Sequence, residues 1–455
     1  MVNNTALMVA SEQSVSEHFD GGCPREANTS HHNYLRKEGI YVWTPSMQAM
    51  ILGSYFYGYT ATQVSGGRLA EKWGGKWVCG IGILGSAIAT FLVPMSADYF
   101  IVIIGAFHGL VYSSVYNIFM KWVPQNERST AIAFMMAAGH FGGFVVSPFT
   151  GFLCDNSFMG GWPAAFYILA IIACVWSALW FIFVTDLPEN HPRISKAELM
   201  LIKSGTNQQT KPEPLKWSKI LKSTAVWAVV FAKTTAAFGY YLISNELPLY
   251  LESVLNVNIT ENGFSNALVY LVVSISMFST GKLAGYINSK QILSLTNVRK
   301  IFQALAAIGP MVCLLLVPLS GCNKQSIVAL IVASMFFFGF CGGGELLIVT
   351  EFAPAYSGTI FGFANCFGSI TGILAPLFVG ILLDENVHDR HNWNLVFYVS
   401  AALYAVGALV FVVFATAKPT KWGSNKCATD KCEVKTDKHR VIDLQSLDRK
   451  VETLK

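Results

Sequence analysis

The sequence predicts an all-α polytopic membrane protein, and three observations support this fold class. Hydrophobic residues make up 53% of the chain and charged residues only 13%, about half the charged fraction of an average soluble protein. The mean hydropathy is +0.46. Eleven apolar stretches each reach the length of roughly 20 residues that a helix needs to cross a bilayer core. The chain is therefore expected to consist mostly of membrane-spanning helices.

The predicted spans follow one another along the chain with polar connections between them. Glycine and proline recur inside the spans, which membrane-embedded helices tolerate better than soluble helices do. The spans are expected at 44–64, 76–95, 99–120, 130–153, 162–184, 225–249, 262–286, 301–319, 326–349, 357–382 and 394–415.

A polar, basic segment with four prolines, at residues 186–224, separates five spans from six. We interpret it as a cytosolic loop between two helix bundles at 41–185 and 225–417. Residues 1–40 are expected to hold the end of a truncated first helix and a lumenal or extracellular glycosylated loop. The tail at 418–455 is polar and rich in lysine and aspartate, which predicts a disordered cytosolic segment.

The positions of lysine and arginine predict which side each loop faces. Alternate loops, including 68–76, 121–128 and 193–222, are rich in these cations, while the loops between them are poor. Cytosolic loops carry the excess of lysine and arginine, so the rich set and the C-terminus are predicted to be cytosolic. Asn28 and Asn258, each in an N-x-[ST] acceptor sequence, then fall on the opposite side, where glycosylation takes place.

The two halves repeat one another. Glycine and proline punctuate one helix of each half at matching intervals, namely Gly139, Gly143, Pro148 and Gly151 in the first and Gly368, Gly372, Pro376 and Gly380 in the second. The halves correspond only if one more helix precedes residue 44. We therefore expect twelve helices, of which eleven are visible, although a genuine eleven-helix protein is the alternative. Small residues let helices pack closely. The residues predicted to serve packing or hinge motion are Gly139, His140, Gly143, Pro148, Gly372 and Pro376.

Several motifs resemble those of the major facilitator superfamily. The stretch Gly67-x-x-x-Glu71-Lys72-x-Gly74-Gly75-Lys76 is similar to the signature of a cytosolic loop between two helices of that family. In such a loop the glycines allow a tight turn, the acid caps a helix start and the cations hold the cytosolic side. Further stretches resemble the anion:cation symporter branch, which includes sialin, the vesicular glutamate transporters and the type I phosphate cotransporters. They lie at 51–59, 62–63, 69–77, 122–129, 261–264, 298–302 and 353–358.

The resemblance implies two six-helix bundles that rock about a central substrate site. It implies a secondary active transporter of small organic anions, such as sialic acid or glutamate, or of phosphate, coupled to protons or sodium. One departure is that 103–121, which corresponds to the family's fourth helix, lacks the arginine and glutamate found there and offers His108 and Tyr112 instead. Another is Ile348, which stands where the family has asparagine. An uncoupled uniporter or exchanger is therefore one alternative, and a transport-inactive scaffold or receptor is another.

Four ionisable residues lie well inside predicted spans, where a charge costs roughly 2.5–3.5 kcal/mol, namely His108, His140, Lys233 and Glu345. We predict that Lys233 attracts the anion and that Glu345 carries the coupling proton, since burial favours the protonated form of a carboxyl group. The alternatives are a static ion pair, or a Lys233 that extends to the membrane edge. His108 is either a titrating group or a neutral histidine in a helix contact.

Hydroxyl and amide groups supply further candidates for the substrate pathway. Tyr55, Tyr59 and Gln63 are four residues apart, which places them on one face of a helix. Such a face suits a carboxylate or sugar ligand, and aromatic packing is the alternative. Asn117 and Asn365 are weaker candidates of the same kind.

Charged residues next to the loop signature are candidates for a gate. Ion pairs there would hold the cytosolic face closed and break when it opens, whereas topology and helix capping alone are the alternative. The candidate gating residues are Gly67, Glu71, Lys72, Gly75, Glu127 and Arg128.

Other classes of function find no support in the sequence. The phosphate-binding motif Gly-x-x-x-x-Gly-Lys-[Ser/Thr] is absent, so ATP-driven transport is not expected, and neither a catalytic set nor metal-ligand spacing is visible. The net charge of +5 is scattered over loops, which argues against nucleic acid binding. We expect a monomer that is not an enzyme and needs no cofactor besides a coupling H⁺ or Na⁺. It would reside in a lysosomal, vesicular or plasma membrane.

Overall fold

A computed structural model describes residues 45–95, 97–124, 127–155, 161–205, 217–255, 257, 259–383, 387–420 and 422. Within these ranges the regular secondary structure is entirely helical, as predicted. Ten of the described helical segments are long and apolar enough to cross a membrane. The predictions for residues 1–40, for glycosylation at Asn28 and Asn258 and for most of the tail lie outside the described residues.

Five long helices make up the described part of the first half. Four of them qualify as membrane spans, and the other, which begins at Pro45, is long enough but less apolar. They are α2 (Pro45–Trp73), α3 (Gly75–Leu92), α4 (Ala97–Trp122), α5 (Arg128–Asp155) and α6 (Trp162–Phe183).

The second half follows a connecting segment that holds three short helices, η2 (Pro188–Asn190), α7 (Lys196–Gly205) and α8 (Trp217–Leu221). The sequence interpretation of this segment as a loop missed these helices. The long helices that follow are α9 (Thr224–Ser253), α10 (Ile259–Ser289), α11 (Leu295–Leu316), α14 (Ser357–Leu383) and α15 (Arg390–Phe414). Between α11 and α14 lie η3 (Pro318–Ser320), α12 (Lys324–Phe338), η4 (Gly339–Gly343), α13 (Glu345–Phe352) and η5 (Pro354–Tyr356).

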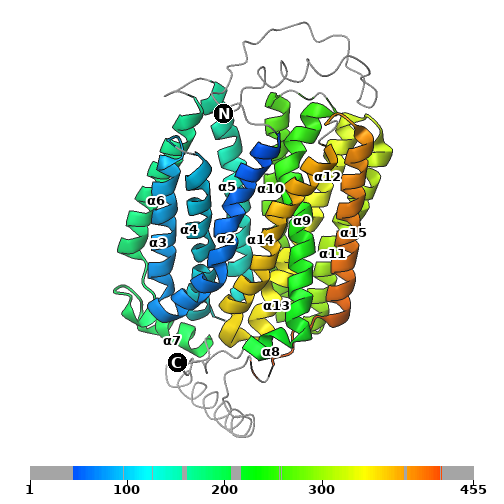
Figure 1. The fold of residues 1–455 in the computed structure, drawn as a ribbon. Helices are drawn as coiled ribbons and strands as arrows, with labels where there is room; N and C mark the ends of the chain where they lie inside the picture. The colour runs from blue at the N-terminus through cyan, green and yellow to red at the C-terminus, as the bar shows by residue number, and fades with distance from the viewer. Residues whose placement is uncertain are drawn as a thin grey trace, which may run out of the picture.

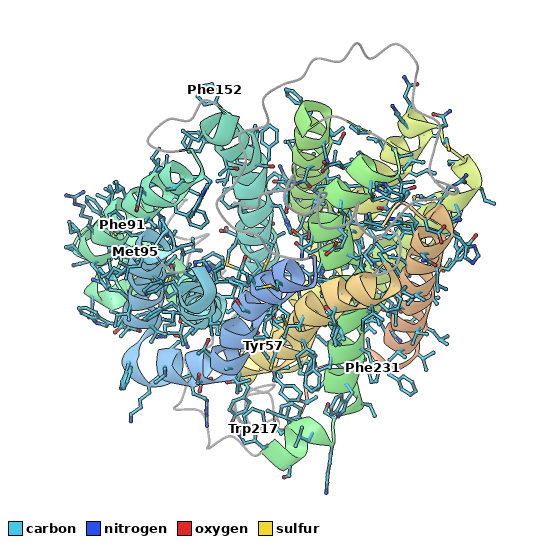
Figure 2. All side chains as sticks on the ribbon, turned by 45° about the horizontal axis from the view of Figure 1, so that its top comes forward. Tyr57, Phe91, Met95, Phe152, Trp217 and Phe231 are labelled. Atoms are coloured by element: carbon cyan, nitrogen blue, oxygen red, sulfur yellow. The ribbon has the colours of Figure 1, made fainter. Side chains whose placement is uncertain are left out.

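The long helices run side by side, with the first half and the second half next to each other (Figure 1). The two halves meet chiefly where α2 packs against α14 and α5 packs against α10. Large apolar side chains such as Phe91, Phe152 and Phe231 are exposed on the outside of the bundle (Figure 2). A surface this apolar belongs in lipid, and the protein is a multi-pass integral membrane protein.

The predicted loop at residues 67–76 is helical instead. Helix α2 continues to Trp73, and only Gly74 separates it from α3. Gly74 has φ 93°, a left-handed conformation that favours glycine, and a Cβ there would lie 2.9 Å from the carboxyl carbon of Asp186. Gly67, Glu71 and Lys72 therefore sit on the last turns of α2, and Gly75 begins α3. The stretch from Gly67 to Trp73 contains no proline, so it continues the preceding helix.

The predicted span 326–349 is broken rather than continuous. Helix α12 ends at Phe338, the chain tightens into the 3₁₀ segment η4, and α13 begins at Glu345. Three consecutive glycines, Gly342 to Gly344, form the end of η4 and the residue before α13, and the last of them has φ −103° and ψ −109°. This break places Glu345 at the first turn of a half-helix inside the membrane region.

The described start of the tail is attached to the second half. The backbone N–H and the hydroxyl of Thr420 both donate to the carbonyl oxygen of Phe352, at 2.9 and 3.0 Å. The backbone N–H of Ala417 donates to the Thr296 hydroxyl at 3.1 Å. The prediction of disorder from residue 418 onward is therefore wrong for residues 418–420.

Candidate functional site

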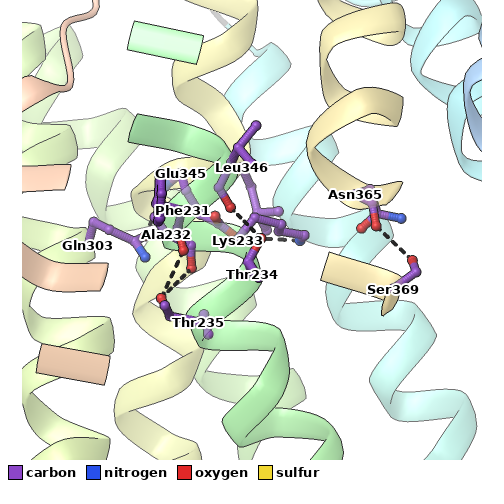
Figure 3. Close-up of polar contacts among 12 residues, drawn as sticks. Phe231, Ala232, Lys233, Thr234, Thr235, Gln303, Glu345, Leu346, Asn365 and Ser369 are labelled. Carbon is purple, nitrogen blue, oxygen red and sulfur yellow. Dashed lines mark hydrogen bonds and ion pairs between the residues drawn. The ribbon is translucent and has the colours of Figure 1, made fainter. Parts of the chain in front are cut away.

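Lys233 and Glu345 form an ion pair inside the bundle. The Nζ atom of Lys233 on α9 lies 3.4 Å from Oε1 of Glu345 on α13 (Figure 3). The Lys233 side chain is 19% exposed and that of Glu345 only 3%. The lysine turns toward the carboxylate, so the alternative of a lysine that extends to the membrane edge is wrong.

Aromatic rings from two other helices surround this pair. The Lys233 ammonium lies 5.5 Å from the centre of the Phe361 ring on α14, within the range of a cation–π contact. Phe361 stacks in turn on Tyr116 of α4, with ring centres 4.2 Å apart. The Tyr116 hydroxyl donates to the Leu346 carbonyl at 3.5 Å, which joins the first half to α13 beside the pair.

The Lys233–Glu345 pair is incompletely satisfied. Oε2 of Glu345 is buried and has no hydrogen-bond partner among the described residues. A buried pair that leaves one oxygen without a donor is poorly suited to a purely structural role, because buried polar groups are normally hydrogen-bonded. It can accept a proton or a new partner.

Tyrosines of α2 extend the polar site into the first half. The Tyr55 hydroxyl lies 3.2 Å from Nδ1 of His108 on α4, and the Tyr55 and Tyr59 rings stack with centres 5.5 Å apart. Asn365 on α14 donates to the Tyr59 hydroxyl at 3.3 Å. Tyr57 points the other way and is 56% exposed. Tyr55 and Tyr59 therefore share one face of α2, as their spacing predicts, and their place in the substrate pathway stays a prediction.

Gln63 belongs to the contact between the halves. Its Nε2 donates to the Ser369 hydroxyl of α14 at 2.9 Å, and only 2% of the residue is exposed. Its Oε1, like Oδ1 of Asn117, is buried without a hydrogen-bond partner among the described residues. Gln63 is therefore better placed to hold α2 against α14 than to line the site with Tyr55 and Tyr59.

The glycine-rich part of α5 also carries a polar contact between the halves. Nδ1 of His140 lies 3.2 Å from the hydroxyl of Tyr240 on α9. One turn further on, a Cβ at Gly143 would lie 3.0 Å from the Tyr270 ring of α10. The packing interpretation holds for Gly143, whereas His140 adds a hydrogen bond across the interface.

Gly139 and Gly372 also lie in close contacts. A Cβ at Gly139 would lie 3.3 Å from the Tyr112 hydroxyl, and one at Gly372 would run into the Phe56 ring of α2. Pro148 and Pro376 both lie inside long helices, α5 and α14. A role of these residues in hinge motion stays a prediction.

The candidate gating residues form a different set of contacts from the one expected. Glu71 accepts a hydrogen bond from Thr359 of α14 at 2.7 Å and pairs with Arg68 on its own helix at 2.7 Å. Lys72 and Glu127 are exposed and make no ion pair among the described residues, and the Arg128 side chain lies outside the description. Among the described members of this set, Glu71 hydrogen-bonds across to the second half, and a Cβ at Gly67 would lie 3.6 Å from the Cα of Thr359 on α14.

Other charged contacts at that end of the bundle were not predicted. Lys121 at the end of α4 pairs with Asp186 at 2.6 Å, and the same carboxylate accepts the backbone N–H of Lys76 at 3.3 Å. Trp122 donates to the Thr185 carbonyl at 3.1 Å. These contacts hold α3, α4 and the segment after α6 together within the first half.

The sequence interpretation also missed a buried ion pair in the second half. The Arg299 guanidinium is fully buried and binds the Glu351 carboxylate with two nitrogens. The predicted spans began at 301 and ended at 349, which left both residues outside them. The sequence did offer one signal for this pair. Arg299 and Glu351 carry opposite charges near the ends of two predicted spans, and such charges can neutralise each other when the spans are neighbours.

Comparisons with known proteins agree with this architecture. A family model described as the Major Facilitator Superfamily matches residues 1–376. Sialin of Homo sapiens is 34% identical over 403 residues, covering 87% of this chain and 80% of its own. Sodium-dependent phosphate transport protein 3 of Mus musculus is 28% identical over 408 residues, covering 87% and 84%. The solved structure of the proton:xylose symporter XylE shares the fold, with TM-score 0.62, 15% identity and coverage of 83% of this chain and 89% of that one.

Proposed function

Because this chain belongs to the Major Facilitator Superfamily and is a solute transporter, we propose that its solute is a small organic anion or phosphate, moved by alternating access with a proton as the coupling ion. Sialic acid, glutamate-like carboxylates and phosphate are the candidate solutes. The observation that carries the proposal is the Lys233–Glu345 pair, whose Oε2 has no hydrogen-bond partner in the described part of the chain.

The choice of an anion rests on Lys233. Its ammonium group is held by one carboxylate oxygen at 3.4 Å and by the face of Phe361. A substrate carboxylate or phosphate that reached Lys233 would compete with Glu345 for the same cation. The Tyr55 and Tyr59 hydroxyls could donate to the remaining oxygens of such a ligand.

The coupling proton follows from what displacement would do to Glu345. A carboxylate left at this buried position without its cation is costly, and protonation removes the cost. The proton adds to a carboxylate oxygen and converts the anion into a neutral acid. One proton would then enter the site with one negative charge of the substrate, and the return of Glu345 to Lys233 would release both.

Uptake into liposomes that contain the purified protein tests the proposal. We expect labelled sialic acid, glutamate or phosphate to accumulate several-fold when a proton gradient is imposed. Glu345→Gln should take up the same solute equally with and without the gradient, because the amide cannot carry a proton. Glu198→Gln, on an exposed position of α7, is the matched control and should behave as the wild type.

Other results of this measurement would replace the proposal. Accumulation with a sodium gradient alone would make sodium the coupling ion. Uptake that ignores both gradients would identify a uniporter or exchanger, the alternative that the absence of acidic residues from 103–121 favours. No uptake of any anion would remove the proposed substrate class.

The orientation in the membrane is part of the same proposal. The loops rich in lysine and arginine, together with the C-terminus, would face the cytosol. A C-terminal epitope tag should then be stained in cells only after the membrane that holds the protein, and the cytosol behind it, are made permeable to antibody. The same tagged cells would show whether that membrane is lysosomal, vesicular or the plasma membrane.

A further inference from the structure

The break between α12 and α13 is supported by side chains from two neighbouring helices. Inside a membrane, backbone groups released by a break need new partners, because no water is available to them. On α10, Ser276 donates to the Phe336 carbonyl at 2.6 Å and Thr280 donates to the Gly339 carbonyl at 2.8 Å. These two bonds support the end of α12 and the start of η4.

Helix α11 supports the other end of the break. Nη1 of Arg299 donates to the Gly343 carbonyl at 2.9 Å, and Oε1 of Gln303 accepts the backbone N–H of Glu345 at 3.1 Å. Arg299 and Gln303 are four residues apart, on one face of α11, and are 0% and 2% exposed. Because Arg299 also binds Glu351, α11 holds α13 near both of its ends.

The fit around Gln303 is close. A Cβ at Gly344 would lie 2.6 Å from Oε1 of Gln303, so this position accommodates glycine and little else. Figure 3 shows Gln303 on one side of Glu345 and Lys233 on the other. The backbone of Glu345 is therefore bound by Gln303 while its carboxylate faces Lys233.

We propose that Gln303 is a positioning residue for transport, which holds the first turn of α13 so that the Glu345 carboxylate stays opposite Lys233. Arg299 supports the same end of the break at Gly343, and Thr280 supports the opposite end at Gly339. Gln303 binds the backbone N–H of Glu345, so its effect on transport would pass through Glu345. The inference rests on the proposed function in so far as Glu345 takes part in transport.

We call the hydrogen bond from the Glu345 backbone N–H to Gln303 the clamp. A native cysteine allows the clamp to be tested without a transport measurement. Cys341 lies in η4, carries a reduced thiol and is 3% exposed, while Cys313 is a reduced, buried cysteine on α11 itself. In Gln303→Leu, which removes the acceptor, we expect N-ethylmaleimide to modify Cys341 several-fold faster, with little change at Cys313. Mass spectrometry of the purified protein measures both sites at once.

Two further variants separate the clamp from a general loss of packing. Gln303→Glu retains an oxygen acceptor of the same length and should restore slow modification of Cys341. Ser400→Ala removes a fully buried hydroxyl that donates to the Val396 carbonyl of its own helix, and it should leave Cys341 protected. Unchanged modification of Cys341 in Gln303→Leu would overturn the proposed clamp.

Transport then shows whether the clamp acts through Glu345. We expect Gln303→Leu to raise the KM for the anion about fivefold, as for the loss of one hydrogen bond, with a smaller change in maximal rate. In the Glu345→Gln background the same substitution should add almost nothing, because effects that act through one residue are not additive. Independent, additive effects would refute the positioning role. If the wild type moved no anion, the proposed function would fail, and the Cys341 measurement would still decide on the clamp.

Discussion

Nζ of Lys233 lies 3.4 Å from Oε1 of Glu345, whereas Oε2 of the same carboxylate has no hydrogen-bond partner among the described residues. The pair joins α9 to a half-helix that begins at Glu345 itself. The carboxylate is favoured at this helix start by the helix dipole and by the lysine, and disfavoured by its burial. A balance of this kind can be shifted by one new charge, which is what a transported anion would bring.

Removal of Lys233 alone should destabilise the protein strongly. In Lys233→Met we expect the free energy of unfolding at pH 8 to fall by about 3–5 kcal/mol, because a buried carboxylate loses its cation. The loss should shrink as the pH falls, since protonation of Glu345 removes the charge. The double variant Lys233→Met/Glu345→Leu should recover most of the stability and none of the transport. Chemical denaturation in detergent measures these values, and a double variant no more stable than the single one would contradict the prediction.

The Tyr55 hydroxyl should contribute to the site, and its neighbour Tyr57 should not. Tyr55→Phe leaves Nδ1 of His108 without its partner at 3.2 Å. We expect anion affinity to fall about fivefold, the equivalent of one hydrogen bond. Tyr57→Phe makes the same chemical change on the exposed face of α2 and should leave affinity unchanged. Equal effects of the two substitutions on binding would argue that Tyr55 only packs.

Thr359 should help to keep the halves together where α2 meets α14. Thr359→Val removes the donor that binds Glu71 at 2.7 Å across the interface. Loss of one hydrogen bond should shift the population toward separated halves about fivefold. Maleimide modification of Cys366, a reduced cysteine of α14 that contacts the Thr60 carbonyl, should rise accordingly. Thr90 donates to the Ser86 carbonyl of its own helix, so Thr90→Val should leave the rate of Cys366 modification unchanged. A faster modification of Cys366 in Thr90→Val would point to a non-specific effect.

Two glycine-to-alanine substitutions should change stability in opposite directions. A Cβ at Gly58 would lie 2.6 Å from the backbone nitrogen of Ala106, so Gly58→Ala should push α2 away from α4. We expect a loss of about 1–3 kcal/mol in the free energy of unfolding. Among the described residues, Gly142 on α5 has no neighbour within 4 Å of its Cβ position, and Gly142→Ala should gain up to about 1 kcal/mol through helix propensity. A destabilised Gly142→Ala would show that this position approaches another helix in a second conformation.

Much of the architecture could be predicted from the sequence because membrane insertion depends on local composition. A run of roughly 20 apolar residues indicates a span whatever surrounds it. The same rule identified Lys233 and Glu345, since a charge inside such a run needs a reason. The alternation of Tyr55, Tyr57 and Tyr59 likewise follows from helix geometry, and two of the three point inward as expected.

Local composition also led to specific errors. The predicted spans excluded Arg299 and Glu351, because a charged residue is unfavourable in a membrane unless a partner neutralises it. The sequence does not show that each of these residues has such a partner. The break at 339–344 was missed because glycine is common in intact membrane helices. The residues that stabilise it, Thr280 and Gln303, lie about 40–60 positions away in the chain and share no local signal with it.

The sequence alone determined that this chain is a bundle of membrane helices with a lysine and a glutamate inside it, because solvation by lipid acts on each segment separately. The tertiary structure decided that those two charges meet at 3.4 Å, that Gln303 binds the backbone of the glutamate, and that Gln63 and Glu71 join the two halves. These relationships depend on which helix faces which and at what rotation. Packing and hydrogen bonding between distant segments set both.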